Sequence, residues 1–288
     1  MIDLHAHTSA SDGSLSFSEL VTEAKRVGLR ALAITDHDTV RCASMIRPGA
    51  SVPLLIPGAE LTVFDEGLGY KDIHILGLFL DTSDAALNSR LSLLESDRLA
   101  QKRATVARLR ELGYDLDFEE VRREASGAVG RPHIAKALLR KYPGEFKSVS
   151  EVFQKLLARG KEGYVEREAG FSLRESVDLI HGAGGLAFVA HPLLYPYDSV
   201  KLLEDFRSLG GDGVEVYYDY IKNRPEERIS AAENTRIIER YQGLARDLGL
   251  LESGGSDFHG AAKGQALGVF GAPDQVLDRL TAALRKPL

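Results

Sequence analysis

Short apolar stretches alternate with helix-like stretches along most of this chain, and several of the apolar stretches end at a histidine or a carboxylate. Residues 1–4 lead into His5, and residues 31–35 lead into Asp36 and His37. The residues between them contain a capping box followed by apolar side chains at helical spacing. Alternating strands and helices favour a parallel sheet or barrel, in which the strand ends meet and build a site.

The same pattern returns later in the chain. Further strands are predicted at residues 52–56, 73–80, 186–190, 213–217 and 250–255. Further helices are predicted at residues 173–180 and 235–248. We therefore expect an α/β fold.

The middle of the chain, residues 84–163, has a different pattern. It contains leucine and valine stripes at helical spacing and no convincing strand. Helices are predicted there at residues 118–125, 132–141 and 150–158. This segment is therefore predicted to be a helical insertion.

Composition limits the classes of function. The 288 residues carry 36 Lys and Arg against 42 Asp and Glu, which gives a net charge of -6. A protein that holds long nucleic acids by charge usually has a basic surface, so this class of function is not expected. The single cysteine, Cys42, excludes an intrachain disulfide and favours a reducing cytoplasm. The apolar runs are strand-sized and the first residues have no basic segment, so we expect neither a membrane span nor a signal peptide.

Nine histidine, aspartate and glutamate side chains lie at or near the predicted strand ends. They are His5, His7, Asp12, His37, Glu60, His74, His191, Asp257 and His259. In an extended H-x-H pair such as His5 and His7, both imidazoles point to one face and can reach one ion. Imidazole and carboxylate ligands suit zinc, manganese or iron, and nine of them exceed the needs of one ion. A carboxylate such as Glu60 can bridge two ions, so that several cations face one phosphate.

Each of these residues also has an ordinary structural interpretation, and the metal hypothesis rests on the set. A single histidine can be a hydrogen-bonded core residue, and Asp36 and Asp38 can be caps or turn formers. Seven of the eight histidines nevertheless lie near predicted strand ends or functional turns. The exception is His181, in the last turn of a helix before Gly182, where we expect it to contact the carboxyl-terminal carbonyls of that helix.

A second candidate feature is the sequence Gly-Arg-Pro-His at residues 130–133, which begins a predicted helix. Pro132 suits the first helical position, so Arg131 and His133 would lie where backbone N–H groups and the helix dipole favour an anion. On the residues alone, a capped helix with a surface arginine is an equally good interpretation.

Two further groups have ordinary interpretations that we prefer. Arg98, Lys102 and Arg103 form a basic cluster that fits a solvated helix face better than a phosphate site. Tyr217 and Tyr218 could stack on a base, but aromatic residues at a strand end are more often packing residues.

Six motifs are spread along the chain: DLHAHTSASDG, ITDHDT, PGAEL, DIHILGL, VAHP and GGSDFHG. They resemble the successive motifs of the PHP (polymerase and histidinol phosphatase) family, in the family's order and over nearly the whole chain. The resemblance is strongest to stand-alone phosphoesterases that act on nucleoside 3',5'-bisphosphates and on the 5' ends of short RNA. It implies a distorted (β/α)7 barrel formed by residues 1–82 and 165–288, with a helical insertion at residues 83–164 that covers the active site.

The resemblance also implies a trinuclear metal centre. His5, His7, Glu60 and Asp257 would hold one ion, Glu60, His74 and His191 a second, and Asp12, His37 and His259 the third. We expect three divalent ions, manganese first and iron or zinc as alternatives. A hydroxide bridging the ions would attack phosphorus, so no side chain is predicted to be catalytic by itself. GRPHIA resembles the family's insertion motif, in which Arg131 and His133 face the substrate.

These inferences favour a metal-dependent phosphatase or phosphodiesterase that removes the 3'-phosphate of nucleoside 3',5'-bisphosphates, with trimming of short RNA from its 5' end as a further use of the site. A phosphatase for a small metabolite such as histidinol phosphate is one alternative. A metal-binding regulatory module without turnover is another. The expected partner is a small phosphorylated substrate, a nucleotide or a short RNA 5' end, with no membrane association and no stable DNA complex. The polar segment 219–236 looks longer and differently charged than in relatives, and it would change substrate preference if it lines the pocket.

Overall fold

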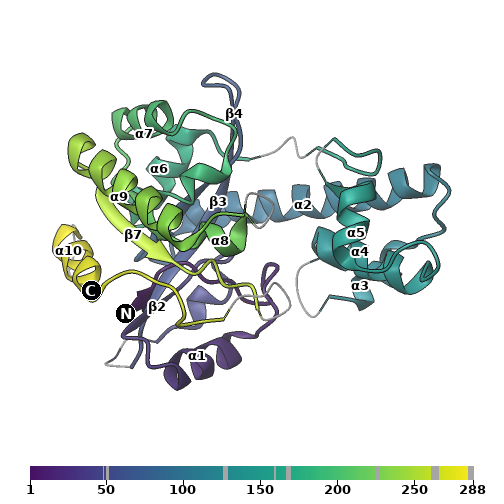
Figure 1. The fold of residues 1–288 in the computed structure, drawn as a ribbon, viewed down its shortest axis with the longest axis horizontal. Coiled ribbons are helices and arrows are strands. Elements are labelled where there is room, and N and C mark those ends of the chain that lie inside the picture. Colours follow the sequence, from purple (N-terminus) through teal and green to yellow (C-terminus); the bar gives the residue numbers. More distant parts are fainter. Residues whose placement is uncertain are drawn as a thin grey trace. The chain divides into compact units, whose positions relative to one another are not determined.

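The computed structural model describes residues 1–47, 49, 52–125, 129–158, 160–166, 170–224, 228–260 and 266–284. The chain divides into two compact units (Figure 1). The first combines Met1–Leu91 with Gly170–Leu288, and the second is Ser92–Ala169. The second unit therefore interrupts the sequence of the first.

The first unit contains a seven-stranded sheet in which the strands follow one another in chain order. The strands are β1 (Ile2–Asp3), β2 (Ala31–Ile34), β3 (Leu54–Asp65), β4 (Tyr70–Leu78), β5 (Leu186–Val189), β6 (Gly213–Tyr218) and β7 (Leu251–Gly255). The backbone N–H of Leu4 donates to Gly254 O at 3.1 Å, and that of His7 donates to Phe258 O at 2.8 Å. These bonds bring the two edges of the sheet together, so the sheet is nearly closed into a barrel.

Strand β4 runs antiparallel to both of its neighbours, although alternation with helices favours parallel strands. The chain turns from β3 into β4 through the short segment 66–69, whereas a parallel pair needs a crossover of about a dozen residues. Contrary to the prediction of a strand that ends at residue 56, β3 continues through Pro57 and Gly58. A Cβ on Gly58 would lie 2.6 Å from the carbonyl oxygen of Gly77, so glycine permits the close approach of β3 and β4. Glu60 consequently lies inside a strand and not after one.

Helices pack on the outside of this sheet (Figure 1). They are α1 (Phe17–Arg26), α6 (Leu173–Gly182), α7 (Ser199–Ser208), α8 (Tyr220–Asn223), α9 (Ala231–Leu248) and α10 (Asp274–Ala283), with short 3-10 turns at Ala43–Met45 and Pro192–Leu194. The capping box predicted for α1 is confirmed, because Ser16 N donates to Glu19 Oε2 at 2.8 Å and Ser16 Oγ accepts from Glu19 N. Leu4, Leu78 and Phe188 form part of the core that joins the sheet to α10.

The second unit contains helices joined by turns and loops, and no strand lies among its described residues, as predicted. It contains most of α2 (Ala85–Glu111), then α3 (Phe118–Arg123), α4 (Arg131–Lys141), α5 (Val149–Val152) and a π-helical turn at Phe153–Leu157. Its own buried core includes Leu109, Phe118, Ile134, Leu138 and Phe146. Because these side chains pack with one another, the insertion has the properties of a small helical subdomain.

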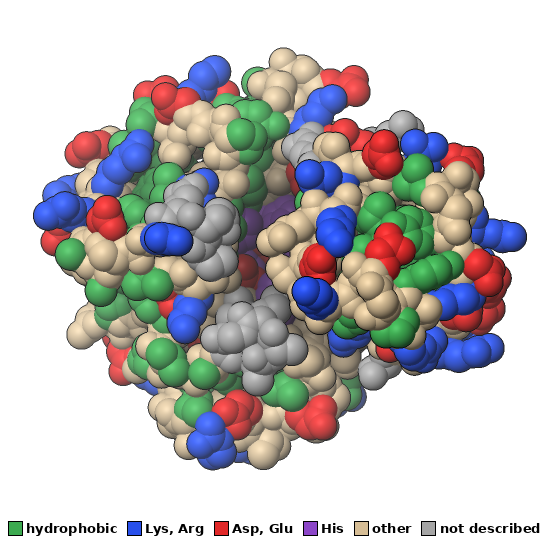
Figure 2. Space-filling model, turned by 45° about the vertical axis from the view of Figure 1, so that its right-hand side comes forward, with side chains coloured by type: hydrophobic (Ala, Val, Ile, Leu, Met, Phe, Trp, Pro, Cys, Tyr) green, Lys and Arg blue, Asp and Glu red, His purple; other side chains and the backbone are tan. Residues whose placement is uncertain are grey.

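Charged side chains of both signs are interspersed over the face drawn in Figure 2, and histidine surface is visible among them. This mixture is consistent with the net charge of -6 and with the absence of a large basic patch in that view. Among the described residues, no helix combines the length and the apolar character needed to cross a membrane.

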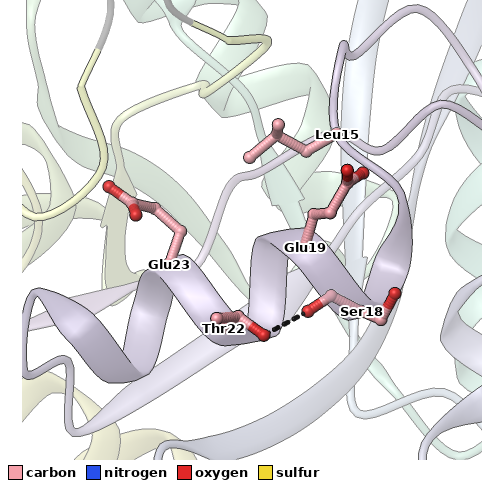
Figure 3. Close-up of a pocket in the computed structure, with 5 residues that line it drawn as sticks. All are labelled: Leu15, Ser18, Glu19, Thr22 and Glu23. Carbon is pink, nitrogen blue, oxygen red and sulfur yellow. Dashed lines mark hydrogen bonds between the residues drawn. The ribbon is translucent and has the colours of Figure 1, made fainter.

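The outer face of α1 carries a shallow, open depression lined by Leu15, Ser18, Glu19, Thr22 and Glu23 (Figure 3). Its polar groups already have partners on the same helix. Thr22 Oγ1 donates to the carbonyl of Ser18 at 2.8 Å, Glu19 caps the helix, and Glu23 pairs with Arg26 at 2.6 Å. None of the candidate ligands lines this depression, so it is not a candidate active site.

Candidate metal centre

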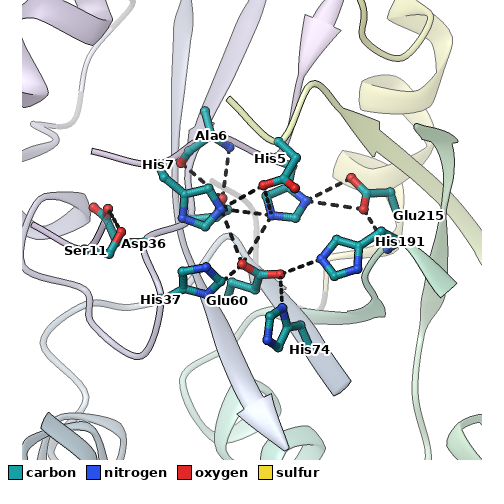
Figure 4. Close-up of polar contacts among 12 residues, drawn as sticks. His5, Ala6, His7, Ser11, Asp36, His37, Glu60, His74, His191 and Glu215 are labelled. Carbon is teal, nitrogen blue, oxygen red and sulfur yellow. Dashed lines mark hydrogen bonds and ion pairs between the residues drawn. The ribbon is translucent and has the colours of Figure 1, made fainter. Parts of the chain in front are cut away.

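The nine candidate ligands converge at one end of the barrel. Figure 4 shows part of this set, namely His5, His7, His37, Glu60, His74 and His191. His5 and His7 follow β1, His37 follows β2, Glu60 lies in β3, His74 in β4, His191 follows β5, and Asp257 and His259 follow β7. Asp12 lies in the loop between β1 and α1. Ligands from strands that are distant in sequence are thus brought together by closure of the sheet.

His5 and His7 lie just beyond the short strand β1, which ends at Asp3. An isolated bridge between Ala6 and Phe258 continues the pairing past the end of the strand. Both imidazoles point the same way, and their Nε2 atoms are 3.1 Å apart. Burial, and then His259 and His37, lower the pKa of His7 to about 3, so this imidazole is neutral and can offer a lone pair.

Glu60 is the centre of the cluster and is fully buried. Imidazole nitrogens of five histidines lie within 3.4 Å of its two carboxylate oxygens: His5, His7, His37, His74 and His191. Burial raises the pKa of Glu60, but His37, His74 and His5 more than offset this effect and lower it well below its usual range. Glu60 is therefore an ionised carboxylate surrounded by nitrogen ligands.

Four overlapping groups of side chains have ligand atoms that all lie within 4.8 Å of one another and could hold a metal ion. They are His7, Asp12, His37 and His259; His5, His191 and Asp257; His5, His7 and Glu60; and His37, Glu60 and His74. Each of the nine candidates belongs to at least one group, and Glu60 belongs to two. His191 is grouped with His5 and Asp257, although its Nε2 also lies 3.0 Å from Glu60 Oε1.

The donor atoms fit divalent cations. Within the described parts of the chain, Glu60 Oε2 is among the buried side-chain atoms that make no hydrogen bond. Such atoms are costly to bury without a partner, and here three imidazole nitrogens face Glu60 Oε2 without a well-formed hydrogen bond. Nitrogen and carboxylate oxygen donors of this kind suit manganese, iron or zinc.

Asp257 closes the cluster on the side of β7. Its Oδ1 lies 3.2 Å from His7 Nε2 and 3.4 Å from both His5 Nε2 and His259 Nδ1. Burial raises the pKa of Asp257, but His5, His259 and His7 outweigh it and lower the pKa well below its usual range. The hydroxyl of Tyr218 donates to the other oxygen, Oδ2, at 2.8 Å. The carboxylate is thus charged and held at both oxygens.

Asp36 and Asp38 have a structural role next to the ligands, but it is not turn formation, because the hydrogen-bond partners of these carboxylates lie 24 to 28 residues away in the sequence. Asp36 accepts hydrogen bonds from Thr8 N at 2.8 Å and from Ser11 Oγ at 2.5 Å. Asp38 accepts from the backbone N of Thr62 at 2.7 Å and from its hydroxyl at 2.9 Å. These two carboxylates brace the segments next to the ligands, and neither belongs to the four groups.

His181 lies outside the cluster, as predicted, but its predicted contact is wrong. Its Nε2 bonds to Asp212 Oδ2 at 2.7 Å, a side chain outside its own helix. Asp212 also accepts from the backbone N of Ala187 at 2.7 Å. A nearby carboxylate outweighs a helix terminus as a partner for an imidazole.

Tyr217 and Tyr218, at the end of β6, have the packing role that the sequence favoured over base stacking. Tyr218 is fully buried, so it cannot stack on a base. Tyr217 donates to Glu252 at 2.9 Å. In the polar segment 219–236, helix α8 forms and α9 begins at Ala231, ahead of the predicted start at residue 235.

In the helical unit, Arg131 and His133 occupy the first turn of α4, as predicted. The backbone N–H of Gly130 donates to His133 Nδ1 at 2.9 Å, so His133 caps its own helix. The Arg131 guanidinium lies 5.4 Å from the centre of the Tyr164 ring. This geometry contains features of both interpretations, a capped helix and a half-buried cation at a helix N-terminus.

The basic cluster on α2 is only partly solvated. Lys102 is buried and donates to Gln101 Oε1 at 2.5 Å, so the prediction of a solvated face is wrong at this residue. Arg103 is exposed and stacks on the Phe118 ring at 4.2 Å. Packing within the helical unit explains both positions.

One residue of the site was missed by the sequence interpretation. Glu215 lies inside the apolar strand β6 and is fully buried. Its carboxylate contacts His5 and the backbone of His191 (Figure 4). A single acidic residue within an apolar strand was the available signal, because a buried charge needs a partner.

Comparison with known proteins agrees with this geometry. A family model described as the PHP domain matches residues 3–169. The chain belongs to the PHP family. This PHP protein is 36% identical over 265 residues to the 5'-3' exoribonuclease Rnm of Salmonella typhimurium, covering 89% of the chain and 84% of that relative.

Two further relatives of this PHP protein come from Chromobacterium violaceum. The 3',5'-nucleoside bisphosphate phosphatase is 33% identical over 273 residues, which cover 91% of the chain and 88% of the phosphatase. A solved structure described as an amidohydrolase with bound sulfate and no metal has a TM-score of 0.80 and 29% identity, covering 100% of this chain and 98% of that one. The PHP protein is a metal-dependent phosphoesterase with a nearly closed seven-stranded barrel.

Proposed function

We propose that this PHP phosphoesterase removes the 3'-phosphate of nucleoside 3',5'-bisphosphates and trims short RNA from its 5' end at the same site. Relatives named for each activity align with about nine-tenths of the chain, at 36% and 33% identity. Both substrates present a phosphate ester on a nucleotide, so one centre can serve both. The small-metabolite phosphatase and the regulatory module are the competing functions.

The observation that carries the proposal is the buried Glu60 carboxylate surrounded by five imidazoles. We assign the nine side chains as ligands of three divalent ions, with manganese expected first and iron or zinc as alternatives. When bound, such ions neutralise phosphate charge and lower the pKa of a water molecule that can attack phosphorus. Glu60 would serve as a ligand shared by two of these ions, and His7 would offer them a neutral imidazole.

On the substrate side, we propose that Arg131 and His133 bind a phosphate of the nucleotide. A guanidinium forms paired hydrogen bonds to phosphate, and the first turn of α4 adds the positive end of a helix dipole. The sulfate named in the Chromobacterium violaceum structure is a tetrahedral dianion like phosphate, which supports an anion site in that relative.

The single cysteine, Cys42, supports action in a reducing cytoplasm.

The test is a substrate panel with purified protein that has been stripped by a chelator and reloaded with Mn²⁺. The substrates are adenosine 3',5'-bisphosphate, a 5'-phosphorylated short RNA, histidinol phosphate and an aryl phosphate. We expect phosphate release from the bisphosphate with adenosine 5'-phosphate as the product, together with shortening of the RNA from its 5' end. Elemental analysis of the same samples reports the number of ions per chain.

Other outcomes would contradict the proposal in distinct ways. Turnover of histidinol phosphate without turnover of the bisphosphate would indicate a small-metabolite phosphatase. Adenosine 3'-phosphate as the product would show that the enzyme removes the 5'-phosphate and not the 3'-phosphate. Three bound ions with no phosphate released from any substrate would favour a regulatory module.

A further inference from the structure

Glu215 is a buried carboxylate that joins two candidate ligands without being a member of any ligand group. It lies in the middle of β6 and has no exposed surface. Its Oε1 is 3.0 Å from Nδ1 of His5, and its Oε2 accepts a hydrogen bond of 2.8 Å from the backbone N–H of His191 (Figure 4). The four groups that could hold a metal do not include it.

The contact with His5 decides which ring nitrogen of that histidine carries the proton. Both oxygens of the Glu215 carboxylate act as hydrogen-bond acceptors here, so the Nδ1 that faces Glu215 is the N–H donor. The opposite nitrogen, Nε2, faces the cluster and lies 3.4 Å from Glu60 Oε2 and from Asp257 Oδ1. Glu215 therefore favours the tautomer of His5 whose lone pair points toward the other ligands.

The contact with the backbone of His191 stabilises a backbone conformation that is rare for residues other than glycine. His191 has a positive φ of 27°, in a region that is costly for a residue with a Cβ. Its N–H is held by Glu215, while its Nε2 lies 3.0 Å from Glu60. The bond to Glu215 thus stabilises the conformation that directs this imidazole into the cluster.

The two ligands come from strands that do not pair with each other. His5 follows β1 and His191 follows β5, and these strands are not neighbours in the sheet. Glu215 on β6 spans them from inside the barrel. Its carboxylate is suited to this because both of its neighbours are donors, whereas an amide would offer one acceptor and one donor.

We propose that Glu215 is a positioning residue that sets the tautomer of His5 and the backbone of His191, so that both imidazoles present Nε2 to the metal ions. The inference rests on the proposed metal centre and is independent of which phosphate ester is cleaved. Carboxylates that accept the second N–H of a metal-bound histidine commonly change metal affinity by about 10- to 100-fold when they are replaced.

The test compares two isosteric variants. Glu215→Gln keeps the size of the side chain but places an NH₂ group against one of two donors. Asp212→Asn is a matched control, because Asp212 also accepts from a histidine, His181, and from a backbone N–H, that of Ala187, but contacts no candidate ligand. Mn²⁺ dissociation constants and the visible spectrum of the Co²⁺-loaded proteins are measured for both variants and the wild type.

We expect Glu215→Gln to bind Mn²⁺ about 10- to 100-fold more weakly and to alter the Co²⁺ spectrum, with Asp212→Asn unchanged in both. Wild-type affinity and spectrum in Glu215→Gln would overturn the proposal. Equal weakening in Asp212→Asn would also overturn it, because it would indicate a general effect of losing any carboxylate that accepts from a histidine and a backbone N–H.

A second measurement uses only the wild-type protein, so it still tests the proposal if Glu215→Gln does not fold. In wild-type protein labelled with ¹⁵N-histidine and loaded with Zn²⁺, the proposal requires His5 to carry its proton on Nδ1. A proton on Nε2 of His5 would overturn it. Absence of bisphosphate hydrolysis in the wild type would instead reject the proposed substrate and leave these metal-binding results unaffected.

Discussion

The hydroxyl of Tyr218 donates a hydrogen bond of 2.8 Å to Oδ2 of Asp257, although Tyr218 ends β6 and Asp257 follows β7. Burial, and next the carboxylates of Asp257 and Glu215, raise the pKa of Tyr218, so its hydroxyl stays protonated. This bond orients Asp257 so that Oδ1 faces His5, His7 and His259.

Tyr218→Phe is expected to weaken Mn²⁺ binding by about tenfold, because Asp257 loses the donor that orients it. The measurement is the Mn²⁺ dissociation constant from calorimetry. Tyr217→Phe is the matched control, since the neighbouring hydroxyl bonds to Glu252 away from the ligands. If both variants bind Mn²⁺ as the wild type does, Tyr218 has no part in positioning Asp257.

Glu60→Gln is expected to reduce kcat by on the order of 10³-fold, because a neutral amide cannot hold two cations and several kcal/mol of charge stabilisation are lost. Metal content and phosphate release are measured on the same sample. The control is Asp65→Asn at the end of the same strand, where the carboxylate accepts from Leu68 N and Leu173 N. Near-normal kcat with full metal content in Glu60→Gln would remove Glu60 from the centre.

Metal binding is expected to strengthen as the pH rises toward about 9. Burial lowers the pKa of His74, but the Glu60 carboxylate outweighs it and raises the pKa to about 9. His74 must lose this proton to act as a ligand, so binding at neutral pH releases it. In the metal-free chain, the same shift adds stability that is present below about pH 6.5 and is lost as the pH rises through about 9.

Calorimetry in buffers of different ionisation enthalpy measures the protons released on Mn²⁺ binding. His74→Gln should reduce that number by about one, since its own proton is no longer available. His181→Gln should not change it, because His181 pairs with Asp212 outside the cluster. A Mn²⁺ affinity that is constant between about pH 6 and pH 9 would contradict the assignment of His74 as a ligand.

Arg131→Ala is expected to raise KM with little change in kcat, because a charged hydrogen bond to phosphate is worth about 1.5–3 kcal/mol. That range corresponds to about 10- to 150-fold in affinity. Arg140→Ala on the same helix is the control, since Arg140 pairs with Glu124 at 2.6 Å. An unchanged KM in Arg131→Ala would exclude Arg131 from substrate binding.

Much of the candidate site could be predicted because each ligand marks a local change in the sequence. His37 and His191 follow short apolar stretches, and polar residues at the ends of such strands are the ones that build a site in an α/β barrel. The helical character of the insertion could also be predicted from local sequence, because it depends on the spacing of apolar residues along α2 and the helices that follow it.

Other parts of the fold depend on contacts that local spacing does not encode. The antiparallel direction of β4 follows from a tight turn between two strands and from glycine-mediated approach at Gly58. The burial of Lys102 depends on how α2 packs within the helical unit.

The sequence by itself determined the α/β class, the helical insertion and the identity of the nine candidate ligands, because these depend on residue type and on short-range periodicity. The tertiary structure decided that Glu60 is the common neighbour of five imidazoles. It also decided that Glu215 forms hydrogen bonds with His5 and with the backbone of His191, and that Tyr218 donates to Asp257. These relationships join residues that are far apart in the chain. They exist only once the barrel closes and brings the ends of β1, β5, β6 and β7 together.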